Sequence, residues 1–320
     1  MISKNAIRYG SAALIAGVVA CGAIAQSSDK IPEIIQKVIS ASKKLSYSGS
    51  RTVLLKFGPD QHRHVEFVTK NGPRTRIEFP EEGTYRGQII VETENERRHY
   101  FPNENQIDVM PPRRDEFVGR WLKMGNRGSE SQFKIEDGPP IAGFATKVVQ
   151  VGSPSGFVFQ KLWIDPRTGL VLKREFYGRD GGVQASSEFT KVDYQPKFNR
   201  SDFVLNIPGA KIITPWDRLA KLVGKGGFKN VSLSPKDPFR LESSRIQRIG
   251  NSTALVQDYV NKDGRVALIQ VNSEIDPDKL RRGGRGEVNT YSWQKGGTYF
   301  VLLGNLPEAK LKEMAGKLGG

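Results

Sequence analysis

The stretch "KLWIDPRTGLVLKREFYGRDG", from Lys161 to Gly181, combines a turn signature with the alternating pattern of a strand. Asp165 and the proline after it begin a turn, because an aspartate side chain caps backbone N–H groups and proline fixes φ. Gly169 supplies the left-handed position that such a turn needs. Leu170 and Leu172 then alternate with charged residues, as in a half-buried antiparallel strand. The stretch therefore predicts a β-hairpin with one apolar face and one polar face.

The same hairpin carries the best candidates for catalysis. Asp165 and Glu175 lie on either side of the turn, and a pair of carboxylates is what acid/base hydrolysis requires. The turn itself accounts for Asp165, however, and Glu175 alternates with Leu172 and Phe176 as a residue on the solvated face of a sheet does. We therefore expect these charges to face water, and we predict no catalytic residue.

The residues before the hairpin predict one helix followed by a β-meander. In "IPEIIQKVISASKKLSY", from Ile31 to Tyr47, apolar residues recur at helical spacing along one side. Turn signatures such as "FGPDQ", "KNGPR" and "PEEG" then separate short β-rich runs, which indicates antiparallel strands. A shorter helix is predicted from Asp115 to Met124, and strands resume after it.

The pattern changes near Gly209, where we place a domain boundary. Thr214 is suited to cap a helix that begins at Pro215, and "NKDG", residues 261–264, joins two alternating runs as a tight hairpin. Pro307 begins a last helix whose apolar side is expected to pack on the preceding strands. The sequence thus predicts an α+β protein, mainly antiparallel β, with an N-terminal domain over residues 26–209 and a smaller C-terminal domain over residues 210–320.

The first 25 residues have the features of an export signal. Lys4 and Arg8 precede an apolar run from Ser11 to Ala20 that is too short for an ordinary membrane-spanning helix. Removal of this segment lowers the net charge from +15 to +13. In an exported protein, a basic surface is suited to membranes or acidic envelope proteins and not to nucleic acid. The predicted location is the periplasm or the cell envelope.

Two processing routes fit the end of this signal. Ala23 and Ala25 satisfy the small-x-small rule for cleavage before Gln26, whereas Val18 to Cys21 resembles a bacterial lipobox. Cys21 is the only cysteine, so the mature chain has no disulfide in either case. The second route would give a lipoprotein anchored through Cys21, and both routes stay open.

Other chemical motifs are weak. "GSPSG", residues 152–156, has proline where the nucleophile of a serine elbow would stand. His62 and His64 share a strand face but lack further ligands, so no metal or cofactor is predicted. "RRGGRG", residues 281–286, resembles segments that bind single-stranded nucleic acid. In an exported chain this loop is better suited to an acidic protein partner, and the candidate contact residues are Arg281, Arg282 and Arg285.

The hairpin and its continuation also resemble a known family. The order "FVFQKLWIDPRTGLVLKREFYGRDGGVQASSEFTKVDY", ending in "FNRSDFVLNIPG", is similar to the late strands of outer-membrane lipoprotein-sorting proteins and their relatives. "LSYSGSRTV" resembles the start of one branch, the periplasmic sigma-factor regulators RseB and MucB, and "GGTYFVLLGNLPEAKLKEMAGKL" resembles the end of their C-terminal domain. The first resemblance spans about Ile31 to Gly209. Both together favour the regulators over the carriers, which have only the first domain.

This resemblance implies an unclosed antiparallel barrel wrapped over helices, with a hydrophobic cleft that accepts the acyl chains of lipids or lipoproteins. It implies no catalysis. In the regulators, the protein binds the periplasmic region of a membrane-anchored anti-sigma factor and shields it from proteolysis. Lipid or mislocalised lipoprotein in the cleft relieves that hold. A homo-oligomer is compatible with the resemblance.

Apolar residues at alternate strand positions are the candidates for the lining of this cleft. We expect them to point to one side of a curved sheet, where they serve either as core or as ligand contacts. The candidates are Val53, Leu55, Phe57, Val65, Phe67, Ile77, Phe79, Val91, Leu170, Leu172 and Phe176.

Three functions follow from the sequence. The first is an envelope stress regulator that binds acyl chains and an anti-sigma factor. The second is a periplasmic lipid or lipoprotein carrier that uses the same cleft. The third, ranked last, is a hydrolase of envelope polymers that uses Asp165 and Glu175.

Overall fold

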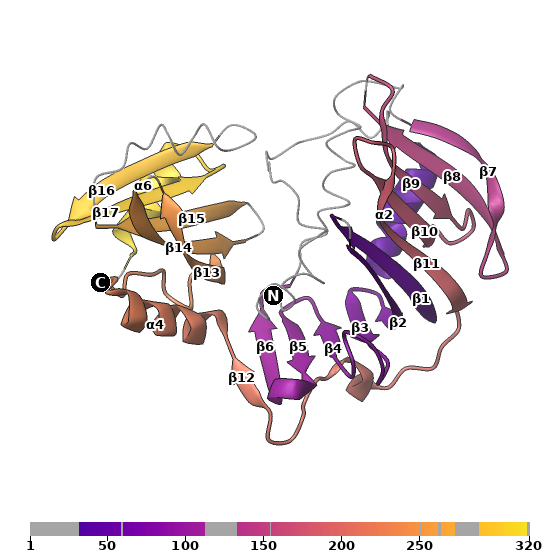
Figure 1. The fold of residues 1–320 in the computed structure, drawn as a ribbon, viewed down its shortest axis with the longest axis horizontal. Helices are drawn as coiled ribbons and strands as arrows, with labels where there is room; N and C mark the ends of the chain where they lie inside the picture. The colour runs from indigo at the N-terminus through magenta and orange to yellow at the C-terminus, as the bar shows by residue number, and fades with distance from the viewer. Residues whose placement is uncertain are drawn as a thin grey trace. The chain divides into compact units, whose positions relative to one another are not determined.

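The computed structural model describes residues 32–58, 60–112, 133–153, 155–249, 251–261, 264–272 and 288–318. The chain divides between Ile212 and Ile213 into two compact units, here called the N-terminal unit and the C-terminal unit. Both consist mainly of antiparallel strands (Figure 1). Some predicted features lie outside the described residues, namely the export signal with Cys21, the helix from Asp115 to Met124, and the loop with Arg281, Arg282 and Arg285.

The N-terminal unit is built on one twelve-stranded sheet, in the order β12-β6-β5-β4-β3-β2-β1-β11-β10-β9-β8-β7. Neighbours that follow each other in sequence are joined as hairpins, which gives the predicted meander, and β11 returns to pair with β1. The elements of this unit are α2 (Glu33–Lys44), β1 (Ser46–Phe57), β2 (Asp60–Asn71), β3 (Arg74–Glu78), β4 (Ile89–Glu92), β5 (Arg97–Phe101), η2 (Pro102–Glu104), β6 (Gln106–Met110), β7 (Phe133–Ile141), β8 (Phe144–Gly152), β9 (Val158–Ile164), β10 (Val171–Tyr177), β11 (Val183–Asp193), η4 (Arg200–Phe203) and β12 (Lys211–Ile213).

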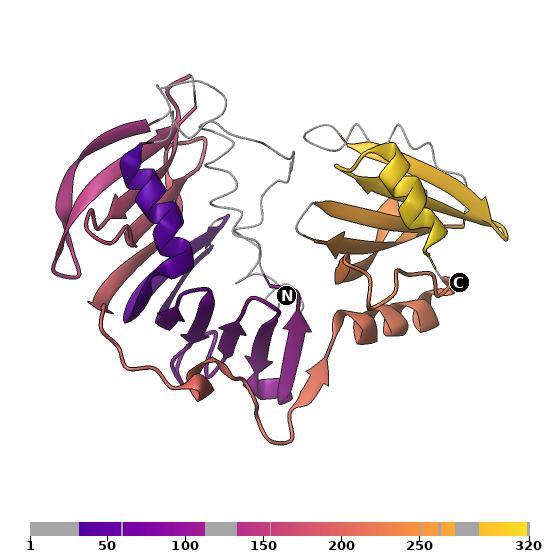
Figure 2. The same ribbon diagram turned by 180° about the vertical axis from the view of Figure 1, so that it is seen from behind.

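The helix α2 confirms the helix predicted before the meander. It begins after Pro32 with an acidic residue in its first turn and ends with Lys43 and Lys44, so its charges oppose the helix dipole at both ends. Its buried residues Ile35 and Val38 pack into a cluster on β8 and β9 that consists of Val149, Val151, Leu162 and Ile164. Figure 2 shows α2 lying across one face of the sheet. We call this face the inner face and the opposite face the outer face.

The sheet is curled and unclosed. β7 contacts β11 although it lies four places further along the sheet. Within the described residues, β7 and β12 are the two end strands of the sheet, and each pairs on one side only. An unclosed antiparallel sheet that curls over a helix was expected, and this part of the fold prediction is confirmed.

Part of the outer face is covered by the segment that follows β11. Phe203 at the end of η4 and Leu205 after it pack on Val91 of β4 and Ile107 of β6. A capping box between Asn199 and Asp202 holds η4 in place. This segment covers β4 to β6, so it buries one end of the outer face.

The C-terminal unit has a five-stranded sheet in the order β13-β14-β15-β17-β16. One face carries the larger core cluster, in which Leu219 of α4 and Leu311 and Met314 of α6 meet Leu268 and Phe300 of the strands. The predicted hairpin, the helix capped by Thr214 and the last helix are all confirmed. The elements are α4 (Pro215–Gly226), β13 (Arg240–Ile249), β14 (Ser252–Val260), β15 (Arg265–Val271), β16 (Asn289–Lys295), β17 (Thr298–Gly304) and α6 (Glu308–Gly316).

Candidate functional site

The pairing register of the N-terminal sheet shows which side chains share the inner face. Residues that are directly opposite each other on neighbouring strands point to the same side of a sheet. The first such row runs from β1 to β8 through Val53, Ser187, Arg174, Leu162 and Val149. Because Leu162 and Val149 pack against α2, the whole row lies on the inner face.

A second row runs parallel to the first. It passes through Leu55, Ala185, Phe176, Gln160 and Val151, and Val151 also packs against α2. Along these two rows the inner face is therefore mainly apolar, with a few polar side chains among the apolar ones.

Eight of the eleven sequence-predicted lining residues contribute to the inner side. Leu170 and Leu172 belong to the buried cluster of Tyr47, Val68 and Phe189, with Ile77 packed against it. Leu55 and Phe79 are also buried. The predicted lining residues that are core residues in this structure are therefore Leu55, Phe79, Leu170 and Leu172. Val53, Ile77 and Phe176 are half-buried, and Phe57 at the strand end is 37% exposed. These four partly exposed side chains have apolar surface that a ligand could contact.

The expectation that all candidates point to one side is wrong for Val65, Phe67 and Val91. In β2 the residues opposite Val53 and Leu55 are His64 and His62, so Val65 and Phe67 point to the outer face. Val91 lies under the covering segment on that same outer face. Alternation shows which residues of one strand share a face, but the pairing register decides how two strands match, and a shift by one residue reverses the face.

A buried ion pair that sequence reasoning missed lies beside these apolar residues. Arg51 donates from Nε and Nη2 to Glu66 Oε2, at 2.7 and 2.6 Å, and His64 Nε2 lies 3.1 Å from Glu66 Oε1. Burial alone would raise the pKa of Glu66, but the Arg51 charge and the hydrogen bonds from His64 and Arg51 lower it to about 2. The sequence signal that could have revealed this ion pair is that His64 and Glu66 stand two residues apart in one strand and so share a face. Both occupy inner-face positions, where apolar residues would be expected.

The buried polar atoms near this face include two that have no hydrogen-bond partner among the described residues. They are Gln160 Nε2, on a side chain that is 3% exposed, and His64 Nδ1, beside the rings of Phe79 and Tyr85. A buried N–H that lacks an acceptor is costly. An oxygen atom of a bound molecule would satisfy Gln160 Nε2.

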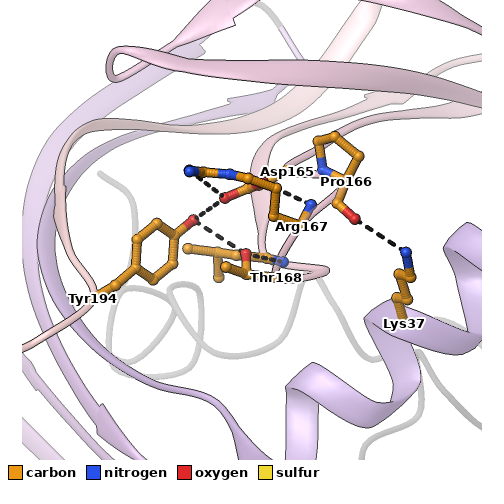
Figure 3. A network of polar contacts seen from close by, with 7 residues as sticks. Lys37, Asp165, Pro166, Arg167, Thr168 and Tyr194 are labelled. Carbon is orange, nitrogen blue, oxygen red and sulfur yellow. Dashed lines mark hydrogen bonds and ion pairs between the residues drawn. The ribbon is translucent and has the colours of Figure 1, made fainter.

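The turn of the central hairpin is a structural lock between the sheet and α2 (Figure 3). Asp165 accepts hydrogen bonds from the Arg167 backbone N–H at 2.9 Å and from the Tyr194 hydroxyl at 2.8 Å. Lys37 of α2 donates to the Pro166 carbonyl at 3.3 Å. The turn prediction is confirmed, but the expectation that Asp165 faces water is wrong, because it is 0% exposed. Its burial would raise the pKa, and the hydrogen bonds from Arg167 and Tyr194 hold the pKa of Asp165 below its ordinary value.

The two carboxylates considered for hydrolysis belong to separate networks. Asp165 is held by Tyr194 and Arg167, whereas Glu175 pairs with Lys173 at 3.1 Å and accepts from the Tyr177 hydroxyl. Glu175 lies opposite Lys161, away from the turn. His62 and His64 do share the inner face, but the described residues contain no group of three or more potential metal ligands. In the same part of the chain, no helix is long and apolar enough to cross a membrane.

Comparison with known proteins places this N-terminal unit in a family. A search of curated proteins finds no match. A search of solved structures finds similarity to the Pseudomonas aeruginosa MucA/MucB complex, with 13% identity, coverage of 90% of this chain and 97% of that chain, and a TM-score of 0.41. An uncharacterised conserved protein from Thermus thermophilus has 16% identity, covers 57% of this chain and 97% of its own, and has a TM-score of 0.42. A LolA superfamily protein from Nitrosomonas europaea has 11% identity, covers 54% of this chain and 96% of its own, and has a TM-score of 0.27.

The sequence itself gives the stronger result. The sequence profile of the MucB/RseB N-terminal domain matches residues 30–207, which is more than half of the chain and contains α2 and all strands from β1 to β11. The chain therefore belongs to the MucB/RseB family.

Proposed function

We propose that the protein is a non-enzymatic regulator of the envelope stress response, which binds the periplasmic region of an anti-sigma factor and modulates its proteolysis. The observation that carries this proposal is membership of the MucB/RseB family over residues 30–207. The predicted export signal is consistent with it, because such a partner is reached only from the periplasm.

The inner face is the proposed binding surface for acyl chains. Val53, Ile77 and Phe176 offer half-buried apolar surface on the inner face, and Phe57 extends it at the strand end. Burial of a methylene group contributes about 0.8 kcal/mol, so even part of an acyl chain on this surface gives useful affinity. Gln160 Nε2 is then available to donate to a carbonyl oxygen of the ligand.

The C-terminal domain is proposed to take the main part in partner binding. Arg281, Arg282 and Arg285 are the candidate residues for an acidic segment of the anti-sigma factor. Cleavage after Ala25 and lipid attachment at Cys21 are the two proposed forms of the exported chain, and they differ in whether the protein is free in the periplasm or anchored.

A pull-down with the chain from Gln26 tests the proposal. The bait is cross-linked in envelope extracts of the source cells, and the captured proteins are identified by mass spectrometry. We expect a protein with a single membrane span and a cytoplasmic sigma-binding domain, and deletion of the gene should change the envelope stress response. Recovery of no such protein, together with an unchanged stress response in the deletion strain, would overturn the proposal.

A lipid or lipoprotein carrier is the second candidate. The observation that favours it is that the inner face lies entirely within the N-terminal unit, which is compact by itself. A carrier delivers bound lipid to an acceptor membrane, whereas a regulator does not need to. Transfer of labelled lipid to acceptor vesicles, with no captured anti-sigma factor, would support the carrier in place of the regulator.

A further inference from the structure

Val65 and Phe67, which the register places on the outer face, form the centre of an exposed apolar patch. Their exposed fractions are 38% and 48%. Leu54 on β1 lies opposite Arg63 and is therefore a diagonal neighbour of Val65 on the same face. We call Leu54, Val65 and Phe67 the outer patch. The outer face of a sheet that meets water is expected to be polar, so these three residues call for an explanation.

The segment that covers β4 to β6 on the outer face does not reach this patch. Phe203 and Leu205 cover β4 to β6, and the contact nearest to β2 is the hydrogen bond from Arg76 Nη1 on β3 to the Asp202 carbonyl at 3.3 Å. Val65 and Phe67 therefore stay exposed in the described N-terminal unit.

The charges around the outer patch are unbalanced in favour of cations. Lys56 and Arg63 lie on the same face of the β1–β2 hairpin, and Lys191 lies opposite Ser50 on β11. None of these three forms an ion pair with a carboxylate in the described part of the chain.

The glutamates of this face on the neighbouring strands β3 and β11 are each paired with a cation. Glu78 pairs with Arg76 at 2.6 Å, and Glu188 pairs at 3.0 Å with Lys173, which also pairs with Glu175. The remaining carboxylate of this face on β11, Asp193, lies opposite Ser48, so three unpaired cations stand against one aspartate. The outer patch is thus an apolar centre with uncompensated cations at its border. This is the pattern that suits an anionic bilayer, in which apolar side chains enter the interface and cations meet the phosphates.

We propose that the outer patch docks the protein on the surface of an anionic phospholipid membrane. The docking surface is opposite to the inner face, so a docked molecule keeps the inner face free for its own ligand. The inference goes beyond the proposed function and needs no anti-sigma factor. A basic protein of net charge +13 without its signal would be drawn to such a surface in any orientation, and the outer patch fixes the orientation.

Vesicle co-sedimentation with the chain from Gln26 tests this inference, since that chain keeps every described residue and lacks the apolar signal. The vesicles contain phosphatidylethanolamine with phosphatidylglycerol, or phosphatidylcholine alone. We expect binding to the anionic vesicles only, and at least tenfold weaker binding for the double variant Val65→Thr/Phe67→Ser. The matched control is Val204→Thr/Ile212→Thr, which removes two apolar side chains that are 58% and 53% exposed outside the patch and should bind as the wild type does.

The border cations are tested with charge-matched variants. Lys56→Gln/Arg63→Gln/Lys191→Gln should bind on the order of a hundredfold more weakly, at about fivefold for each cation near the surface. The control Lys43→Gln/Lys44→Gln/Lys236→Gln removes the same charge elsewhere and should lose much less. Circular dichroism checks that each variant is folded. Equal loss in patch and control variants, or no binding by the wild type, would overturn the inference. Patch-dependent self-association in sedimentation velocity, with no vesicle binding, would replace it with a dimer interface.

Discussion

Gly169 provides a sharp test of the claim that the central turn locks α2 to the sheet. Its φ is +77°, and a Cβ at this position would lie 2.6 Å from the Lys37 carbonyl oxygen in α2. Gly181 at the end of the next turn is the matched control, because its φ is +74° and a Cβ there would meet nothing within 4 Å. Substitution of each glycine by alanine therefore adds the same backbone strain, but only Gly169→Ala adds a contact with the helix.

The expected magnitudes follow from these two terms. A non-glycine residue in the left-handed region costs about 1 kcal/mol, and both variants carry this cost. Relief of the 2.6 Å contact requires the turn and the backbone of α2 to separate by several tenths of an ångström. Overpacking of that kind costs about 1–3 kcal/mol. We therefore expect Gly169→Ala to lower the free energy of unfolding by about 2–4 kcal/mol, and Gly181→Ala by about 1 kcal/mol.

Urea unfolding followed by far-ultraviolet circular dichroism measures the difference. With a slope of about 2 kcal/mol/M, the midpoint of Gly169→Ala should fall about 0.5–1.5 M below that of Gly181→Ala. The signal from α2 should be lost in the same transition as the sheet, since the helix packs on it. Equal midpoints for the two variants would refute the reasoning, because they would mean that the turn at Gly169 is not packed closely against α2.

Three further predictions concern the N-terminal sheet and the helix α4 of the C-terminal unit. The pKa of Glu66 is about 2 in the folded protein and 4.5 for an ordinary glutamate, so Glu66 contributes about 3 kcal/mol to the free energy of unfolding above pH 4.5, and this contribution is lost as the pH falls toward 2. Glu66→Gln should remove this part of the acid sensitivity when urea unfolding is measured at several pH values. An unchanged pH profile of stability would contradict the role of Glu66. Gln160→Leu should leave the free energy of unfolding unchanged or raise it by about 1 kcal/mol, because the buried Nε2 has no acceptor among the described residues. A clear loss of stability would show that the Gln160 amide does have a hydrogen-bond partner in the folded protein. Thr214→Ala should cost about 1 kcal/mol in thermal unfolding of the C-terminal unit, because Thr214 Oγ1 accepts from the Asp217 N–H at 3.2 Å, and Thr214→Ser should restore most of it.

The local elements could be predicted from the sequence because local chemistry determines them. Proline and acidic residues at helix starts, glycine at left-handed positions and alternation within strands indicated α2, the turn at Asp165 and the hairpin of β14 and β15. These features depend on residues within a few positions of each other. The resemblance of the chain to the MucB/RseB family is confirmed by the family match over residues 30–207.

The candidate site was less predictable because it depends on pairing between distant segments. Alternation alone could not show that Val53 faces His64 and that Val65 faces the other way, since this is decided by the register of β1 with β2. The burial of Asp165 depends on Tyr194, which lies 29 residues further along the chain. The ion pair of Arg51 with Glu66 likewise joins two strands across a hairpin. Such polar groups become visible only when the sheet is assembled.

The proposed function, together with the release by lipid that the family resemblance implies, predicts that acyl chains on the inner face weaken binding of an anti-sigma factor. The most direct measurement is a calorimetric titration of the chain from Gln26 with the periplasmic segment of the captured partner, with and without a short-chain phosphatidylglycerol below its micelle concentration. We predict that the lipid weakens partner binding. Val53→Thr should require an about tenfold higher lipid concentration for the same weakening, whereas Val204→Thr should leave the required concentration unchanged. Partner binding that is insensitive to lipid, or equal effects of Val53→Thr and Val204→Thr, would contradict the account.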